Sequence, residues 1–203
     1  MSWFYEPPRA VQTKRNGVMR LHRFLGAWKL KGHDGTEQST PYMDALWRRT
    51  LDAAARRRAD AARVLLLGVG MGNTFNLILR RFPRAEVVGI DWEPELFILG
   101  LELGVFHGDD RASFIEGDAA AIVPGLGGPF DLALIDLFNG HRVADAVSDP
   151  ALQDAVAAKM APGALLCVNG YDQPAVFDGW RARLREEAPQ RYKANRVAVF
   201  RKD

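Results

Sequence analysis

The stretch Val64-Leu-Leu-Leu-Gly68-Val-Gly70-Met-Gly72-Asn73 decides the fold of this chain, because an apolar run leads directly into a glycine-rich turn. The run is typical of a buried strand, and residues 73–82 after it have the pattern of a helix. Gly68 and Gly70 permit a tight turn and let a ligand approach the backbone closely. Asn73 stands where a dinucleotide fingerprint has its third glycine, and no lysine follows as in a phosphate-binding loop. The turn therefore favours an adenosyl ligand without a pyrophosphate.

From residue 62 onward, strand and helix patterns alternate along the chain. We expect strands over 64–68, 86–91, 113–116, 130–136, 164–169 and 194–201. We expect helices over 73–82, 93–103, 150–160 (capped by Asp149) and 176–187, with a helical turn over 119–124. Near-continuous apolar strands between helices predict an α/β fold, a doubly wound and mostly parallel sheet covered on both faces. In such a sheet a ligand binds at the carboxyl ends of the strands.

Residues 1–62 have a different sequence pattern from the rest of the chain, and we expect them to form a separate small unit before the Rossmann-like domain over 63–203. Alternating segments over 18–25 and 27–31, punctuated by glycines, indicate a small antiparallel β unit of two or three strands. A linking helix is expected over 41–61, with Thr40 as its N-cap and Pro41 at its first position.

The composition is that of an ordinary globular protein, with 203 residues, 48% hydrophobic and 26% charged. The net charge is +2, but residues 1–62 carry twelve basic against six acidic residues. That excess of positive charge could attract nucleic acid. However, no basic motif interleaved with aromatic residues is present, so we interpret the basic residues as a solvated helix face and do not expect nucleic acid as a partner. One cysteine, Cys167, excludes an intrachain disulfide, and four scattered histidines predict no metal site. Without a secretory signal or an apolar run near the ~20 residues of a membrane span, we expect a cytoplasmic protein that does not enter membranes.

Two acidic residues follow the second and third expected strands, at the edge where the glycine turn lies. Asp91 ends the strand over 86–91, and a carboxylate there can accept both hydroxyls of a ribose. Trp92 could lie against an adenine face, and Asp118 could accept the adenine amino group. Each acid could instead be a turn or helix-cap carboxylate, but three features at successive strand ends favour a nucleoside site.

Asp136 ends the fourth expected strand and faces the reacting end of such a ligand, where it could act as a general base or orient an amine. The following loop, residues 137–148, contains Gly140 and is expected to form a lid. Phe138 in this loop could contact a cation through its ring or pack into the core. His141 and Arg142 could bind substrate or be solvated.

This order of motifs resembles the class I S-adenosylmethionine-dependent methyltransferases, a superfamily with a Rossmann-like sheet. Within it, the chain is most similar to the spermidine synthase (polyamine aminopropyltransferase) group. The resemblance is carried by the glycine turn, Asp91, Gly117-Asp118-Ala119, Phe130-Asp131-Leu-Ala-Leu-Ile-Asp136 and Ala161-Pro-Gly163, and by Asp34-Gly35-Thr-Glu-Gln38 and Pro41-Tyr42-Met43-Asp44.

The resemblance implies S-adenosylmethionine or its decarboxylated form as the cofactor, with Asp136 as the catalytic residue. The cofactor-binding positions that it implies, with their neighbours, are Gln38, Tyr42, Gly68, Gly70, Gly72, Asn73, Asp91, Trp92, Asp118 and Ala119. It also implies a homodimer formed through the N-terminal β unit.

The chain departs from the group at positions that hold cationic substrates. Met71 replaces the aspartate of the glycine turn, Asn139 replaces the second aspartate of the loop after the fourth strand, and Met43 replaces a histidine. Leu66 stands where many methyltransferases have an acid before the first glycine. Lost carboxylates weaken the case for a polyamine, because a buried cation needs such partners.

We therefore expect an enzyme that binds an adenosylsulfonium and transfers its methyl or alkyl group to a small-molecule acceptor. Two alternatives stay open: a true aminopropyltransferase with relocated amine-binding groups, and a non-catalytic nucleoside-binding or scaffold protein.

Overall fold

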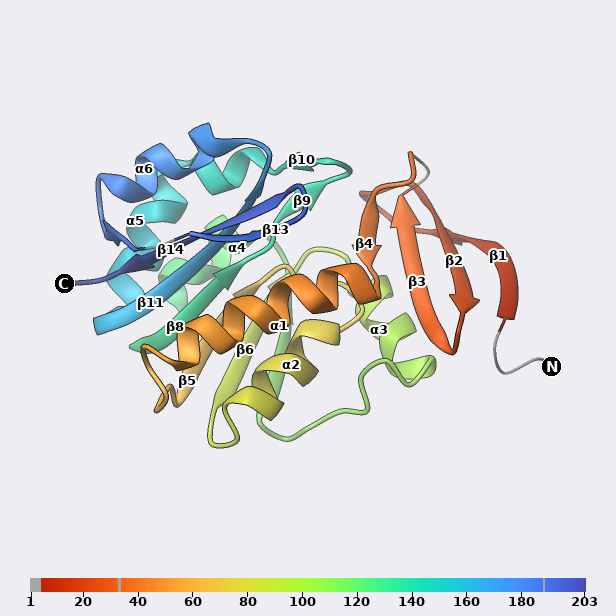
Figure 1. The fold of residues 1–203 in the computed structure, drawn as a ribbon, viewed down its shortest axis with the longest axis horizontal. Coiled ribbons are helices and arrows are strands. Elements are labelled where there is room, and N and C mark those ends of the chain that lie inside the picture. The colour runs from red at the N-terminus through yellow and green to blue at the C-terminus, as the bar shows by residue number, and fades with distance from the viewer. Residues whose placement is uncertain (1–4, 33, 188) are drawn as a thin grey trace.

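The computed structural model, which describes residues 5–32, 34–187 and 189–203, places a small sheet beside a larger α/β structure (Figure 1). The small sheet is antiparallel, in the order β1-β2-β3-β4. Its strands are Tyr5–Gln12, Val18–Phe24, Ala27–Gly32 and Glu37–Ser39. The additional edge strand β1 contains Pro7 and Pro8, which an edge tolerates because it needs fewer N–H donors. The register shifts between Glu6 and Arg9, around these prolines.

The large sheet confirms the predicted fold class. It runs in the order β12-β14-β11-β8-β5-β6-β7, and β13 also pairs with β14. Its parallel strands are β5 (Arg63–Leu67), β6 (Glu86–Asp91), β7 (Ala112–Glu116), β8 (Phe130–Ile135) and β11 (Met160–Tyr171). At the other edge β14 (Asn195–Arg201) runs antiparallel to β11, and both β12 (Arg185–Glu186) and β13 (Gln190–Tyr192) run antiparallel to β14. The strand order reverses between β5 and β8, the place where a doubly wound sheet opens a crevice.

Helices cover both faces of this sheet (Figure 1). On one face lie α1 (Pro41–Ala55) and α2 (Asn73–Arg81), which pack on alternate strand residues such as Leu66 and Leu134. On the other lie α5 (Pro150–Lys159) and the short α4 (Ala119–Ile122) and α6 (Asp178–Arg181), over residues such as Leu67 and Ile135. Two faces buried under helices explain the continuous apolar runs of the strands.

Three sequence expectations are corrected. The helix over 176–187 is wrong, because only α6 and a preceding 3₁₀ turn, Pro174–Phe177, are helical and β12 pairs instead with the edge of β14. The linking helix ends at Ala55 rather than Ala61, because the chain turns back so that Asp131 can accept the amides of Ala62 and Arg63 at 3.0 and 3.1 Å. Within the part of the chain that the structure describes, Thr40 makes no side-chain cap bond to this helix.

A buried carboxylate joins the small sheet to the large one. Glu93, at the entry of α3 (Pro94–Glu102), is 0% exposed and accepts the backbone amides of Lys14, Arg15 and Asn16 from the β1–β2 turn. Apolar side chains from both units surround this joint in one cluster, which includes Met19, Leu21, Leu30, Met71 and Leu96. Among residues 5–32, 34–187 and 189–203, no helix is long and apolar enough to cross a bilayer.

Candidate functional site

A cavity of about 340 Å³ lies between the two units, at the carboxyl ends of β5, β6, β7, β8 and β11. The residues of the expected site that line it are Gln38, Tyr42, Gly68, Gly70, Asn73, Asp91, Trp92, Asp118, Ala119 and Asp136. Gly72 does not line it, because it caps α2 from the left-handed region and packs against Phe97 and Phe106. The topology thus brings together residues from five separate segments of the chain.

The glycine turn fits closely against the strand beside it. Gly68 has a φ of +92°, and a Cβ at this position would lie 2.3 Å from the backbone oxygen of Asp136. Only glycine combines that φ with that approach. Gly70 has a φ of +53° with open space beside it. The turn therefore packs tightly against Asp136 at Gly68 and leaves open space beside Gly70.

Asp91 organises this turn through three backbone amides. Its Oδ2 accepts the amides of Val69 at 2.7 Å and Gly70 at 2.9 Å, and its Oδ1 accepts that of Glu93 at 3.0 Å. A carboxylate offers about four acceptor positions, so about one stays open on Oδ1. In this arrangement Asp91 can accept a hydrogen bond from one ribose hydroxyl. The sequence suggested two such bonds, and the second would require Asp91 to lose its hydrogen bond to one of the three backbone amides.

The residues expected to hold a base lie beside Asp91. The Trp92 ring is covered by the guanidinium of Arg15, whose Cζ lies 5.0 Å from the ring centroid. Asp118 caps α4 by accepting the amide of Ala120 at 2.9 Å, and its side chain is exposed. Asp118 is therefore a helix-cap residue, the alternative to base binding that the sequence offers, and it also lines the cavity.

Asp136 lies on the cavity wall with two side-chain donors. Trp47 Nε1 donates to its Oδ2 at 2.7 Å, and Asn169 Nδ2 donates to its Oδ1 at 2.9 Å. Burial raises the pKa of Asp136 to about 6, and the nearby charge of Asp91 acts in the same direction, while the two hydrogen bonds act against them. A carboxylate with a pKa near neutrality can accept a proton and release it again.

Sequence reasoning missed Trp47 and Asn169 as site residues. Asn169 could have been found, since it ends an expected strand as Asp91 and Asp136 do. Trp47 could not, because a tryptophan on a helix is usually a core residue and its partner depends on how α1 crosses the sheet.

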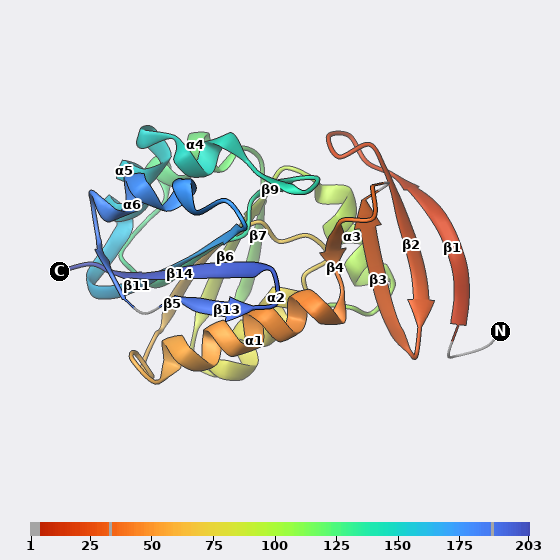
Figure 2. The same cartoon turned by 45° about the horizontal axis from the view of Figure 1, so that its top comes forward.

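The N-terminal residues close the cavity from the other side. Gln38 Nε2 donates to the backbone oxygen of Gly140 at 3.4 Å, and His141 Nδ1 lies 3.3 Å from Asp34 Oδ2. Gly140 and His141 form the turn of a short hairpin, β9 (Phe138–Asn139) and β10 (Arg142–Val143), which reaches toward β4 (Figure 2). This hairpin occupies the segment that the sequence suggested as a lid.

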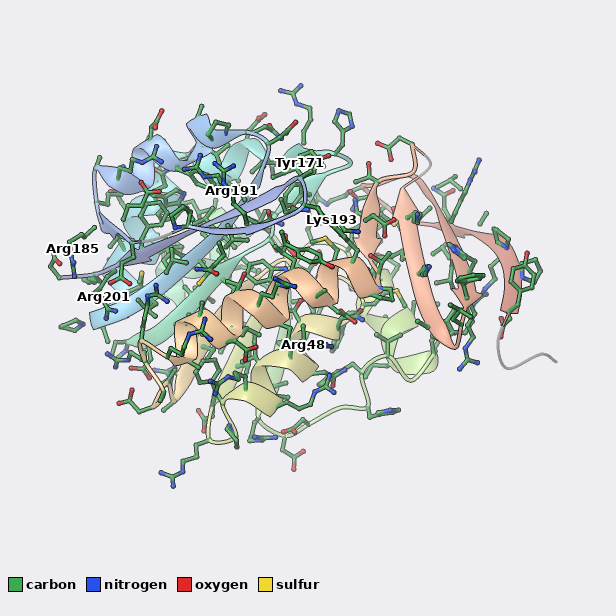
Figure 3. The ribbon with its side chains drawn as sticks, viewed as in Figure 1. Arg48, Tyr171, Arg185, Arg191, Lys193 and Arg201 are labelled. Atoms are coloured by element: carbon green, nitrogen blue, oxygen red, sulfur yellow. The ribbon has the colours of Figure 1, made fainter. Side chains whose placement is uncertain are left out.

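Tyr42 and the last hairpin form a second wall. The Tyr42 hydroxyl accepts from Asn195 Nδ2 at 2.6 Å and donates to the backbone oxygen of Tyr192 at 3.3 Å. Tyr171 and Lys193 lie at this same end of the sheet, whereas Arg185 and Arg201 lie at the far end (Figure 3). Tyr171 lines the cavity, and its φ of +50° is a strained value for a non-glycine residue.

The replaced acidic positions have structural explanations. Met71 is 1% exposed and packs in the cluster between the two units, so its side chain is not on the cavity wall. Asn139 is exposed on β9, opposite Arg142. Within the described residues no cluster of three or more potential metal ligands is found.

Comparison with protein-family models finds no match for this chain. Two curated relatives are similar in sequence. A trans-aconitate 2-methyltransferase of Streptomyces avermitilis is 33% identical over 133 residues, which are 63% of this chain and 45% of the relative. A polyamine aminopropyltransferase 2 of Caldanaerobacter subterraneus subsp. tengcongensis is 32% identical over 108 residues, 51% of this chain and 36% of the relative. The chain thus spans less than half the length of these two relatives.

Solved structures show the same fold. A probable spermidine synthase from Corynebacterium glutamicum superimposes with a TM-score of 0.78 at 15% identity, over 97% of this chain and 80% of the other. Human methyltransferase-like protein 13, solved in complex with SAH, superimposes with a TM-score of 0.63 at 15% identity, over 79% of each chain. The resemblance expected from the sequence, to the spermidine synthase-like group within the methyltransferase superfamily, is confirmed for the fold.

Proposed function

We propose that this chain is a transferase that binds S-adenosylmethionine or a derivative and transfers its methyl or alkyl group to a small acceptor. The observation that carries the proposal is the position of Asp136, which lies on the wall of the nucleoside-sized cavity, against the glycine turn, with a raised pKa. Relatives named as a methyltransferase and an aminopropyltransferase support the same class of reaction.

The residues divide the work between binding and proton transfer. The glycine turn, Asp91 and Trp92 would hold the nucleoside, and Asp118 would face its base. When bound, the sulfonium supplies an electrophilic carbon and a neutral thioether leaving group. Asp136 accepts the proton that the attacking amine or hydroxyl loses as its new bond to carbon forms. Trp47 and Asn169 fix the two carboxylate oxygens, so the base is in place before the acceptor arrives.

The test begins with binding and then turnover. Calorimetry with S-adenosylmethionine, its decarboxylated form, S-adenosylhomocysteine and methylthioadenosine should show binding of at least one adenosyl ligand. Mass spectrometry of candidate acceptors then separates the gain of a methyl group from that of an aminopropyl group. Binding without turnover on any amine, hydroxyl or thiol acceptor would instead support a non-catalytic nucleoside-binding protein, and no binding at all would refute the proposal.

One observation favours aminopropyl transfer as a second candidate. Among the described residues, the cavity wall carries five carboxylates and no lysine or arginine. The five are Glu37, Asp44, Asp91, Asp118 and Asp136. Such a wall suits cationic ligands, which need carboxylates to replace their lost hydration. The two activities predict different preferences between S-adenosylmethionine and its decarboxylated form.

A further inference from the structure

The five carboxylates of the cavity wall differ in how far their charge is already compensated. Asp91 and Asp118 accept backbone amides, and Glu37 pairs with a lysine nitrogen at 2.6 Å. Asp136 receives two side-chain N–H groups at 2.9 Å or less. Asp44 has one long contact, 3.5 Å from its Oδ2 to Asn73 Nδ2, and no ion pair among the residues that the structure describes.

The Asp44 side chain is partly buried. Burial raises the pKa of its carboxyl group, and the charges of Arg48 and Arg80 only partly oppose this effect. The amide of Asn73 is held in place, because its Oδ1 accepts the hydroxyl of Ser39 and its Nδ2 is thereby turned toward Asp44. A partly buried carboxylate with one weak donor has room for a cation.

The position of Asp44 relates it to the reaction centre. It lies in the first turn of α1, three residues before Trp47, so both side chains face the cavity about 4.5 Å apart along the helix axis. Asn73 follows the glycine turn directly, so Asp44 lies beside the turn and Asp136 lies against its start. The glycine turn, Asp44 and Asp136 therefore line one cavity, and a ligand held by the turn would have the Asp44 carboxylate on its α1 side.

We propose that Asp44 binds the ammonium group on the three-carbon arm of the adenosyl ligand. This inference rests on the proposed function. It assigns to α1 the carboxylate that the glycine turn lacks, since Met71 at that turn is buried between the two units. Asp44 would thereby select adenosyl ligands that carry an amino arm over those that lack one.

The experiment compares two probes that differ in this arm. S-Adenosylhomocysteine carries the ammonium group, and methylthioadenosine lacks it, while both contain the same thionucleoside. Their dissociation constants are measured by calorimetry for the wild-type chain and for Asp44→Asn, which keeps the shape of the side chain. A hydrogen bond to a charged group predicts a 10- to 100-fold weaker affinity for S-adenosylhomocysteine, about 1.4 to 2.7 kcal/mol, with methylthioadenosine unchanged.

Glu37→Gln is the matched control, because it removes a carboxylate from the same cavity that already has a lysine partner. It should leave the ratio of the two affinities unchanged. An unchanged ratio in Asp44→Asn, whether both ligands bind normally or both are weakened equally, would overturn the assignment of Asp44. Failure of the wild-type chain to bind either probe, together with failure to bind S-adenosylmethionine and its decarboxylated form, would instead overturn the proposed function itself.

Discussion

Asp136→Asn tests whether burial controls the charge of the proposed base. Because the pKa of Asp136 is raised from 3.8 to about 6, the folded chain ionises this group less readily than the unfolded chain does. Below pH 3.8 both states are protonated and the group costs nothing. As the pH rises from there to 6, the unfolded state loses its proton first and stability falls. Above pH 6 the penalty is constant, at about 3 kcal/mol.

The two pKa values give the size of the effect over a practical range. Between pH 5 and pH 8, Asp136 should lower the free energy of unfolding by about 1.4 kcal/mol. Asparagine does not titrate, so this part of the pH dependence should vanish in Asp136→Asn. The new amide must face one of the donors on Trp47 or Asn169, but that cost is the same at both pH values and cancels in the comparison.

The assay is urea unfolding at pH 5 and pH 8, followed by far-ultraviolet circular dichroism, for the wild-type chain and the variant. Asp110→Asn serves as the control, because that side chain is exposed and its loss should leave the pH dependence of the wild type. If the wild type and Asp136→Asn lose the same stability between the two pH values, to within about 0.5 kcal/mol, burial does not raise the pKa of this carboxyl group.

Three further predictions concern the frame around the site. Gly68→Ala should lower the free energy of unfolding in urea by about 3 kcal/mol or more, because its Cβ would lie 2.3 Å from a backbone oxygen. Gly70→Ala has open space and should lower it by about 1 kcal/mol. Equal losses in the two variants would contradict the close fit at Gly68. Glu93→Gln should cost about 2 to 3 kcal/mol and speed hydrogen exchange of the amides at 14–16, and unchanged exchange would disprove its role as their acceptor. Cys167 is 0% exposed, and burial raises its pKa to about 12. A thiol reagent should therefore label it no faster than the chain unfolds. Faster labelling under native conditions would show that the thiol is accessible in the folded chain.

The parts of the molecule that the sequence predicted are those set by local pattern. The apolar runs and the glycine turn predicted the parallel sheet, and acids at successive strand ends predicted which residues meet at its edge. Asp91 ends β6 and Asp136 follows β8, the two strands on either side of β5, so their convergence at one edge of the sheet follows from the topology. The cap of α5 by Asp149 was likewise readable, from an acid followed by proline.

The parts that were missed depend on contacts between distant segments. Trp47 reaches Asp136 across 89 positions, and only the packing of α1 on the sheet sets that pair. The stretch 185–186 has no strong strand pattern, and it pairs with β14 because that edge is available. Pro7 and Pro8 argue against a strand, yet β1 forms because it needs partners on one side only.

The backbone amides of the β1–β2 turn donate to Glu93, which belongs to the other unit. The N-terminal sheet therefore depends on one acid that is distant in the sequence. The N-terminal sheet could be fused to a related α/β domain only if that domain also had a carboxylate at the position that corresponds to Glu93. Conversely, a chain without its first sixteen residues would leave the Glu93 charge enclosed with no amides to receive it.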